Sequence, residues 1–126
     1  MDEVVKKIAA PDLRAYVVWV PVLPDDDAQA AARAARRFSD PRLVQYWDPD
    51  RALGWTLGKA LGLPPRGHGS WGVAWDVYLV YPRGAAWKTV TEPALWMQQL
   101  EDVPASKAPK LDGGALREVV EGLLGR

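Results

Sequence analysis

The chain has 126 residues, enough for a single domain built around one hydrophobic core. Its 16 basic and 16 acidic side chains cancel, and no apolar run approaches the roughly 20 residues of a membrane span, so the composition argues against nucleic-acid binding and against a membrane protein. Cysteine is absent and histidine occurs once, which excludes disulfides and thiolate catalysis and makes a zinc site hard to assemble.

The first part of the chain alternates predicted helices and strands. A cap-forming Asp with Val and Ile on one side predicts a short amphipathic helix over residues 2–9. The apolar run at 13–22 predicts a strand that is covered on both faces, as in a central parallel sheet. Three Asp at the start of 25–38 and Arg residues at its end match the helix dipole and predict a crossover helix. A second strand, at 42–47, is then expected to lie parallel to the first.

A third helix is predicted to start at Pro49, with Asp48 as its N-cap and leucines spaced by four. The glycine- and proline-rich segment 62–72 follows it and predicts an exposed loop. Glycines at the same spacing as the leucines form a stripe that favours close packing against a sheet: Gly54, Gly58 and Gly62.

The last third of the chain predicts a β-hairpin and a packing helix. Residues 73–81 read as a strand, 82–85 as a turn and 86–91 as the hairpin partner. A short helix is predicted over 93–100. Asp112 then caps a final amphipathic helix, whose apolar residues follow a helical period. No internal repeat or domain boundary is visible, so residues 1–126 are expected to form a single domain.

Several runs carry a resemblance to a known superfamily. The first strand ends in Val-Leu-Pro-Asp at 22–25, the run 46–50 leads into a helix with Ala-Leu-Gly-Leu at 60–63, and 77–84 looks like the family's strand and tight turn. On these features, residues 13–124 resemble the redoxin branch of the thioredoxin-like superfamily, which includes disulfide reductases and peroxiredoxins. The resemblance implies an α/β, thioredoxin-like three-layer sandwich with a mostly parallel sheet, a C-terminal β-hairpin and a packing helix.

The chain departs from this family where the redox chemistry should lie. Family members begin with a strand and a helix that carries the active-site cysteine or Cys-x-x-Cys pair, and they place a cis-proline just before the third-strand equivalent. Here residues 2–9 correspond only to the tail of the active-site helix, and 74–76 (Ala-Trp-Asp) stand where the threonine–proline pair would be expected. The fold is therefore expected to be N-terminally truncated and to lack its redox centre.

The missing strand determines the partner that we expect. In the family it lies between the equivalents of 13–22 and 73–81, so its loss should leave two apolar edges with unpaired backbone groups. These two strands could pair with each other in antiparallel fashion. Alternatively, another chain could cover them by strand exchange or β-augmentation. We expect a homodimer, or another protein chain that completes the sheet.

Tryptophan supplies most of the candidate binding residues, because seven tryptophans stand against one phenylalanine. Tryptophan combines a large contact area with a polar handle and is enriched at interfaces and ligand pockets. Trp19 and Trp47 lie in predicted strands, where packing in the core also explains them. Trp71 and Trp75 border the predicted loop and are balanced between packing and binding. The candidate binding tryptophans are Trp47, Trp71 and Trp75.

Two ionisable residues are further candidates. Asp76 lies in an apolar run and, if buried, could be a general base with a raised pKa, although such a residue more often faces an edge or caps a turn. His68, between two glycines, could titrate near neutrality, although an exposed loop histidine is the simpler interpretation. Acidic clusters at 25–27 and 48–50 are explained as helix caps, so no metal site is predicted. Four arginines form a local basic patch that the helix dipole explains without a ligand: Arg33, Arg36, Arg37 and Arg42.

The leading hypothesis is a non-catalytic thioredoxin-like interaction module, inactive in redox chemistry because it has no sulfur nucleophile, with Trp47, Trp71, Trp75 and Asp76 as its contact surface. The alternative is a non-thiol enzyme or small-molecule-binding protein that uses Asp76 or His68 in a Trp-lined pocket. A third hypothesis is a remnant that folds as a dimer without a biochemical role of its own. We expect no cofactor, and a cytoplasmic location because the first ten residues contain no apolar leader.

Overall fold

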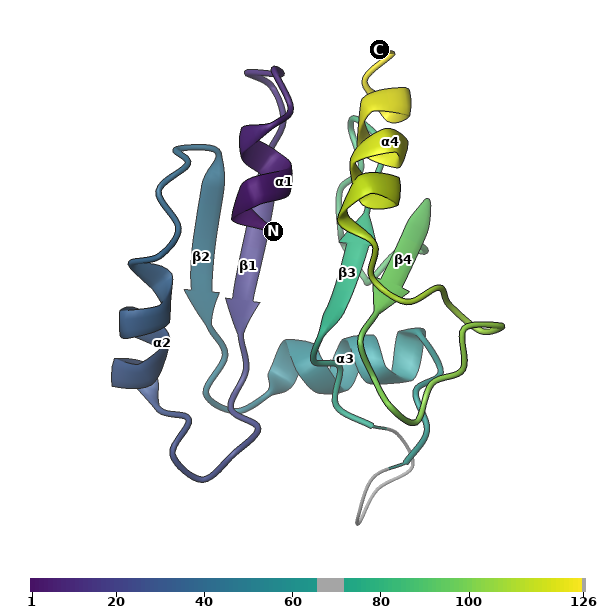
Figure 1. Ribbon diagram of the computed structural model, residues 1–126. Coiled ribbons are helices and arrows are strands. Elements are labelled where there is room, and N and C mark those ends of the chain that lie inside the picture. Colours follow the sequence, from purple (N-terminus) through teal and green to yellow (C-terminus); the bar gives the residue numbers. More distant parts are fainter. Residues whose placement is uncertain (66–71, 126) are drawn as a thin grey trace. The chain divides into compact units, whose positions relative to one another are not determined.

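The structure is a computed structural model that describes residues 1–65 and 72–125 (Figure 1). The chain is a mixed α/β protein and divides into two compact units, Met1–Ala52 and Leu53–Arg126. Its elements, in chain order, are α1 (Asp2–Lys6), β1 (Ala15–Trp19), α2 (Ala28–Ala35), β2 (Leu43–Trp47), α3 (Ala52–Ala60), β3 (Val77–Val80), β4 (Leu95–Gln98) and α4 (Gly113–Leu123). In the described parts of the chain, no helix is both long and apolar enough to cross a membrane.

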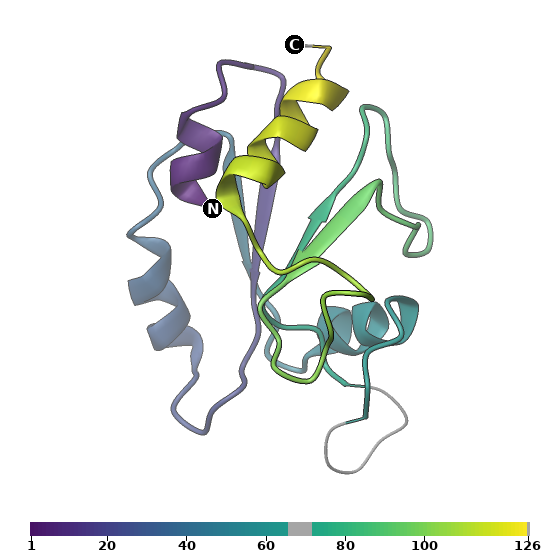
Figure 2. The same cartoon turned by 45° about the vertical axis from the view of Figure 1, so that its right-hand side comes forward.

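The first unit is built on a parallel pair of strands, as the sequence predicts. β1 and β2 pair from Ala15↔Leu43 to Trp19↔Trp47. α2 connects them and lies alongside β2 in both views (Figures 1 and 2). β1 is shorter than the predicted strand at 13–22, because the chain leaves the sheet after Trp19 to form a turn before α2.

Aspartates organise this turn and the start of α2. The Asp26 carboxylate accepts hydrogen bonds from the backbone N–H groups of Val22 (2.8 Å) and Leu23 (2.7 Å). Asp27 has an extended backbone and its side chain accepts a hydrogen bond from Ala30 N at 2.7 Å, which makes it the N-cap. The prediction that the acidic run caps this helix is confirmed.

One face of the β1–β2 pair is exposed, whereas the sequence predicts that the first strand is covered on both faces. The exposed fractions are 63% for Tyr16, 38% for Val44 and 54% for Tyr46. Side chains alternate along a strand, and the register places Tyr16 beside Val44, so these three residues share one face of the sheet. We call Tyr16, Val44 and Tyr46 the open face of β1–β2.

The second unit contains an antiparallel pair, but its second strand is not the predicted one. β3 pairs with β4 from Val77↔Gln98 to Val80↔Leu95. The predicted hairpin partner at 86–91 has no strand structure, and the predicted helix at 93–100 is wrong because it contains β4. The turn after β3 does form, with Ala85 N donating to Pro82 O at 3.2 Å. The chain then continues as a long loop, visible in Figure 2, before it returns to β3.

The apolar core of the second unit lies between α3 and the segments that flank β3 and β4. Its buried members are Leu57, Leu63, Ala74, Leu100 and Val103. α3 starts at Ala52 and not at Pro49, so the prediction that Asp48 directly precedes the helix as its N-cap is wrong, although the Asp48 side chain accepts a hydrogen bond from Ala52 N at 2.9 Å. Asp112 is the N-cap of α4, as the sequence predicts, and its side chain accepts a hydrogen bond from Ala115 N at 2.7 Å.

The glycine stripe of α3 packs closely, although not against a sheet. A Cβ atom on Gly58 would lie 1.7 Å from the carbonyl oxygen of Gly72. Gly54 O accepts a hydrogen bond from Ala74 N at 2.8 Å. The stripe therefore lets the backbone that leads into β3 run against the helix. Gly62 has a φ of 63°, in the left-handed region that glycine adopts most readily, and it follows the end of the helix.

The strands of the described residues form two separate two-stranded sheets, β1–β2 and β3–β4. The mostly parallel single sheet that was expected is therefore not what these residues form. β1 and β3 also do not pair directly with each other, which was one of the two expected ways of closing the sheet. The parallel pair, the antiparallel pair near the C-terminus and the final helix are each present.

Candidate functional site

The outer edge of β1 is open. At one end of the β1–β2 ladder, Ala15 N donates to Arg42 O (3.0 Å), and at the other Asp48 N donates to Trp19 O (2.9 Å). In a parallel strand, the N–H and C=O groups of every second residue face the same adjacent strand. Ala15 and Trp19 face β2 in this way, so the backbone groups of Tyr16 and Val18 point away from β2. Outside that ladder, no residue in the described ranges hydrogen-bonds to the backbone of Tyr16 or Val18.

Apolar side chains adjoin this open edge. Neither β1 (AYVVW) nor β2 (LVQYW) contains a charged residue. Natural sheet edges are usually protected by lysine, proline, a bulge or inward-pointing charge, because an exposed strand edge is a template for another chain. The edge of β1 has no such protection between Ala15 and Trp19, and it lies next to the open face of β1–β2.

Among the described residues of the second unit, β3 also has an open edge. Gln99 N donates to Asp76 O at 3.0 Å and Ala94 N donates to Val80 O at 2.8 Å, so the backbone groups of Val77 and Leu79 point away from β4. The outer edge of β4, in contrast, is covered at Gln98. This residue donates its N–H to Pro109 O (3.1 Å) and accepts from Leu111 N (2.9 Å).

The residues proposed from the sequence do not form one described cluster. Trp47 ends β2 in the first unit and lines a cavity there. Trp75 and Asp76 belong to the second unit, immediately before β3. Trp75 is 38% exposed, and Asp76 is exposed with a φ of 51°. Trp71 and His68 lie outside the described residues.

Asp76 is exposed, so it is not the buried general base that the sequence offered as one interpretation. The charge of its carboxylate instead affects the pKa of a neighbouring side chain. Burial, together with the negative charge of Asp76, raises the pKa of the Tyr78 phenol. The Tyr78 hydroxyl donates a hydrogen bond to the Gln99 side chain at 2.8 Å. No group of three or more His, Asp or Glu side chains within the described ranges could hold a metal ion.

No known protein family, curated protein or solved structure matches this chain. The thioredoxin-like assignment is therefore an expectation from the residue pattern of the sequence.

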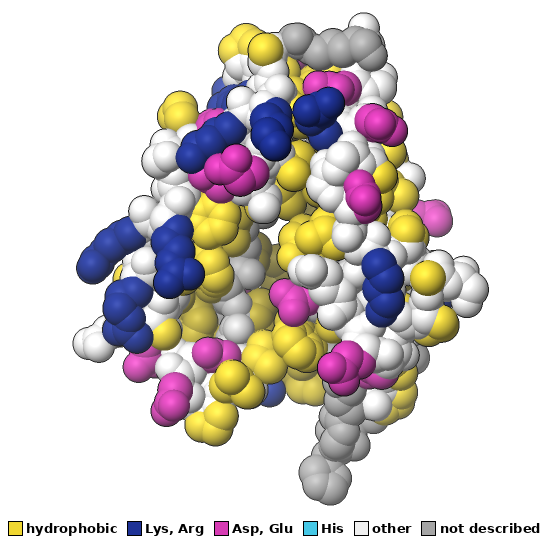
Figure 3. All heavy atoms as spheres, viewed as in Figure 1, with side chains coloured by type: hydrophobic (Ala, Val, Ile, Leu, Met, Phe, Trp, Pro, Cys, Tyr) yellow, Lys and Arg dark blue, Asp and Glu magenta, His cyan; other side chains and the backbone are white. Residues whose placement is uncertain are grey.

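The exposed basic patch contains three of the four arginines that the sequence groups together. Arg33, Arg36 and Arg37 are exposed, and Figure 3 shows basic side chains along α2 with acidic ones at its beginning. This arrangement matches the helix dipole. Arg42 is not part of the exposed patch, because its guanidinium is hydrogen-bonded within the first unit.

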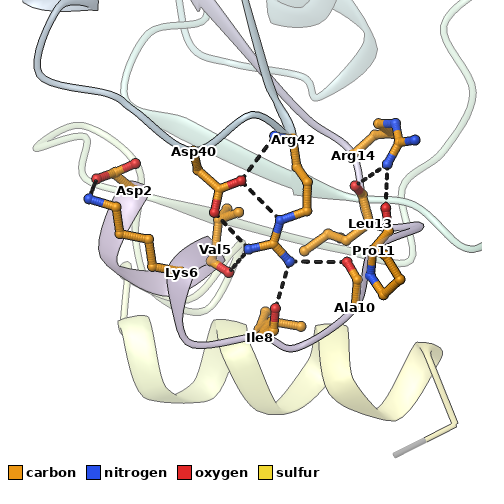
Figure 4. A network of polar contacts seen from close by, with 10 residues as sticks. All are labelled: Asp2, Val5, Lys6, Ile8, Ala10, Pro11, Leu13, Arg14, Asp40 and Arg42. Carbon is orange, nitrogen blue, oxygen red and sulfur yellow. Dashed lines mark hydrogen bonds and ion pairs between the residues drawn. The ribbon is translucent and has the colours of Figure 1, made fainter.

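The Arg42 guanidinium links the start of β2 to the end of α1 (Figure 4). It donates to Ile8 O at 2.6 Å, Ala10 O at 3.0 Å and Val5 O at 2.6 Å. It also pairs with the Asp40 carboxylate, and this contact lowers the pKa of Asp40 to about 2. All of these partners are internal, so we assign the group a structural role.

Sequence reasoning missed the open face of β1–β2. Tyr16 lies in the strand that we expect to be covered on both faces, and the sequence gives no expectation about which face of the second strand holds Val44 and Tyr46. A signal was present, because Gln45 interrupts the apolar residues of β2 and separates Val44 and Tyr46 by the two-residue period of one strand face. α2 determines which face of β2 is covered, because Ala35 O of this helix accepts a hydrogen bond from the Gln45 side chain at 3.1 Å.

Proposed function

We propose that this chain is a non-catalytic thioredoxin-like interaction module that forms a homodimer through the open edge of β1. The observation that carries the proposal is the set of outward-pointing backbone groups at Tyr16 and Val18, next to an exposed apolar face. A two-stranded sheet is marginally stable by itself, so an added strand would stabilise the first unit.

The order of the elements supports the thioredoxin-like assignment. A parallel β1–α2–β2 crossover unit comes first, and an antiparallel β3–β4 pair and a terminal helix follow. In the family that the sequence resembles, a further strand lies against the equivalent of β1, and in the proposed dimer the second copy supplies it. The family's thiol chemistry requires a sulfur nucleophile, which a chain without cysteine does not provide.

A second copy of the chain suits this edge because β1 can pair with itself. In an antiparallel arrangement about a two-fold axis at Val17, Tyr16 lies opposite Val18 of the second copy, and both residues offer free backbone groups. β1 carries no charge, so bringing two copies together causes no repulsion within the strand. The open faces of both copies then become continuous across the new four-stranded sheet.

The test is the mass of the full chain in solution at micromolar concentration, measured by light scattering or sedimentation. We expect twice the 13.9 kDa mass of one chain, with slow hydrogen exchange at the Tyr16 and Val18 amides. The variant Val18→Pro removes an N–H that faces the open edge and leaves the β1–β2 ladder intact, so it should give a folded monomer. Leu123→Lys, at an exposed position of α4, is the matched control and should remain dimeric.

Two results would overturn the proposal. One is a wild-type mass of a single chain combined with rapid exchange at Tyr16 and Val18. The other is a dimer whose dissociation constant is unchanged by Val18→Pro, since the interface would then lie elsewhere. Circular dichroism of each variant distinguishes a lost interface from a lost fold.

A further inference from the structure

A cavity in the first unit lies beside the carboxyl ends of the two parallel strands. Its volume is about 250 Å³, somewhat below the roughly 300–1,000 Å³ of pockets for drug-sized ligands. Trp19 and Trp47, the last residues of β1 and β2, both line it and are partners in the strand register. The carboxyl ends of parallel strands are where open α/β sheets commonly bind ligands.

One aromatic wall of the cavity is held in place by its neighbours. The Trp19 indole N–H donates to the Gln45 side chain at 3.0 Å, and the Gln45 amide in turn donates to Ala35 O at 3.1 Å. The Trp19 ring also packs edge to face on Phe38, with ring centroids 5.8 Å apart. A ring fixed in this way loses little conformational freedom when a ligand binds.

Small side chains on α2 leave the space open. Ala30 and Ala34, one turn apart on the helix, line the cavity together with the two tryptophans. Larger residues at these positions would fill it. The cavity therefore results from an alanine-rich helix face placed against two aromatic strand ends.

Negatively charged side chains line the cavity near the start of α2. Asp26 and Asp27 line the cavity, and no Lys or Arg side chain of the described residues does. Backbone hydrogen bonds from Leu23 and Val22 lower the pKa of Asp26. The α2 dipole contributes about half a positive charge at this end, which is less than the charge of two carboxylates, so the net local charge is negative.

We propose that this cavity binds a free small organic cation of the alkylammonium class. Indole faces attract such cations through their quadrupole, and tryptophan is the most effective aromatic side chain for this purpose. The two carboxylates supply the opposite charge, and the limited volume selects a headgroup smaller than a drug-sized ligand. Neither the dimer nor the thioredoxin-like assignment is required for this site.

The test compares choline with 3,3-dimethylbutan-1-ol, its uncharged analogue of the same shape. Binding to the full chain is followed by the nuclear magnetic resonance signals of the indole N–H groups. We expect choline to shift the Trp19 and Trp47 signals until they saturate, and the alcohol to bind at least about tenfold more weakly because it lacks the charge.

Conservative variants separate charge from shape. Asp26→Asn and Asp27→Asn keep an acceptor oxygen for the backbone N–H groups, so they should fold while each weakens choline binding about three- to fivefold. Asp25→Asn, which does not line the cavity, should leave binding unchanged. Ala30→Leu fills the cavity and should abolish the shifts.

The proposal fails if choline does not saturate, if the alcohol binds equally well, or if the asparagine variants bind choline as the wild type does. The choline-binding test and the test of the dimer can fail independently. Trp19 and Trp47 lie on the sheet face opposite to Tyr16 and Tyr46, so Val18→Pro should break the dimer without moving the choline-induced shifts.

Discussion

Arg42 holds Asp40 through two parallel contacts: Nε donates to Oδ1 at 3.0 Å and Nη2 donates to Oδ2 at 2.7 Å. Bidentate pairing of this kind fixes the guanidinium plane. The remaining donors are thereby directed at the carbonyl groups at the end of α1 and just after it. A local pair two residues apart thus positions a contact that spans more than thirty residues of sequence.

This pair predicts a loss of stability in acid. The Arg42 hydrogen bonds lower the pKa of Asp40 to about 2 from its ordinary value of 3.8. A lowered pKa stabilises the folded state above the unfolded value, and this stabilisation is lost as the pH falls from about 4 to about 2. Urea unfolding over this range should therefore show a shallower pH dependence for Asp40→Asn than for the wild type. Asp25→Asn, at an exposed position, serves as the control, and identical slopes for Asp40→Asn and wild type would contradict the assignment.

Gln98 is expected to be essential for the fold of the second unit. Its side chain is fully buried, donates to Val103 O (3.1 Å) and Ala108 O (2.9 Å), and accepts from Leu100 N (2.7 Å). Gln98→Leu leaves buried backbone groups without partners and should lower the free energy of unfolding by about 2–4 kcal/mol. The exposed neighbour offers a control, since Gln99→Leu should cost less than about 1 kcal/mol. Equal effects in denaturant titrations would show that this network is not needed.

Two glycines in helices should respond in opposite directions to alanine. Gly58→Ala would place a Cβ 1.7 Å from Gly72 O, so the backbone must move apart, and the cost should exceed the gain of about 1 kcal/mol in helix propensity. A Cβ on Gly122, in α4, would meet no described atom beyond its own helix within 4 Å, so Gly122→Ala should stabilise by about 0.5–1 kcal/mol. Thermal unfolding of both variants measures the signs. A stabilised Gly58→Ala would refute the close contact.

Tyr78 provides a test at alkaline pH. Burial first, and the charge of Asp76 second, raise its pKa above the ordinary value of 10.0. A raised pKa means that the neutral phenol favours folding, and that this contribution is lost as the pH rises through the folded-state value. Asp76→Asn should lower the pKa only part of the way, and asparagine tolerates the positive φ at this position. Phenolate absorbance titrations, with Tyr78→Phe to identify the signal, should show this change, and an unchanged pKa would exclude an effect of Asp76.

Features that depend on neighbouring residues could be read from the sequence. Asp27 and Asp112 each cap a helix through a backbone N–H three residues away, so the residue pattern alone predicts the contact. The parallel pairing of β1 and β2 also followed from two apolar runs separated by a helix of sufficient length.

The identity of β4 required the tertiary structure. A short apolar run such as Leu95–Gln98 fits either a helix or a strand, and periodicity does not distinguish them. Hydrogen bonds to β3 and the burial of the Gln98 amide among carbonyl groups from later in the chain made it a strand.

The cavity and the open face of β1–β2 likewise combine features that the sequence predicts with features that only the tertiary structure shows. The sequence by itself marked Trp47 as a binding residue, and explained Trp19 by packing and Asp27 by capping. Only the strand register and the packing of α2 brought these residues around one cavity, and the same register left Tyr16 and Tyr46 on the opposite face. The physical reason is range: a cap needs a partner within one helical turn, whereas a cavity or a sheet face depends on pairing between residues some thirty positions apart.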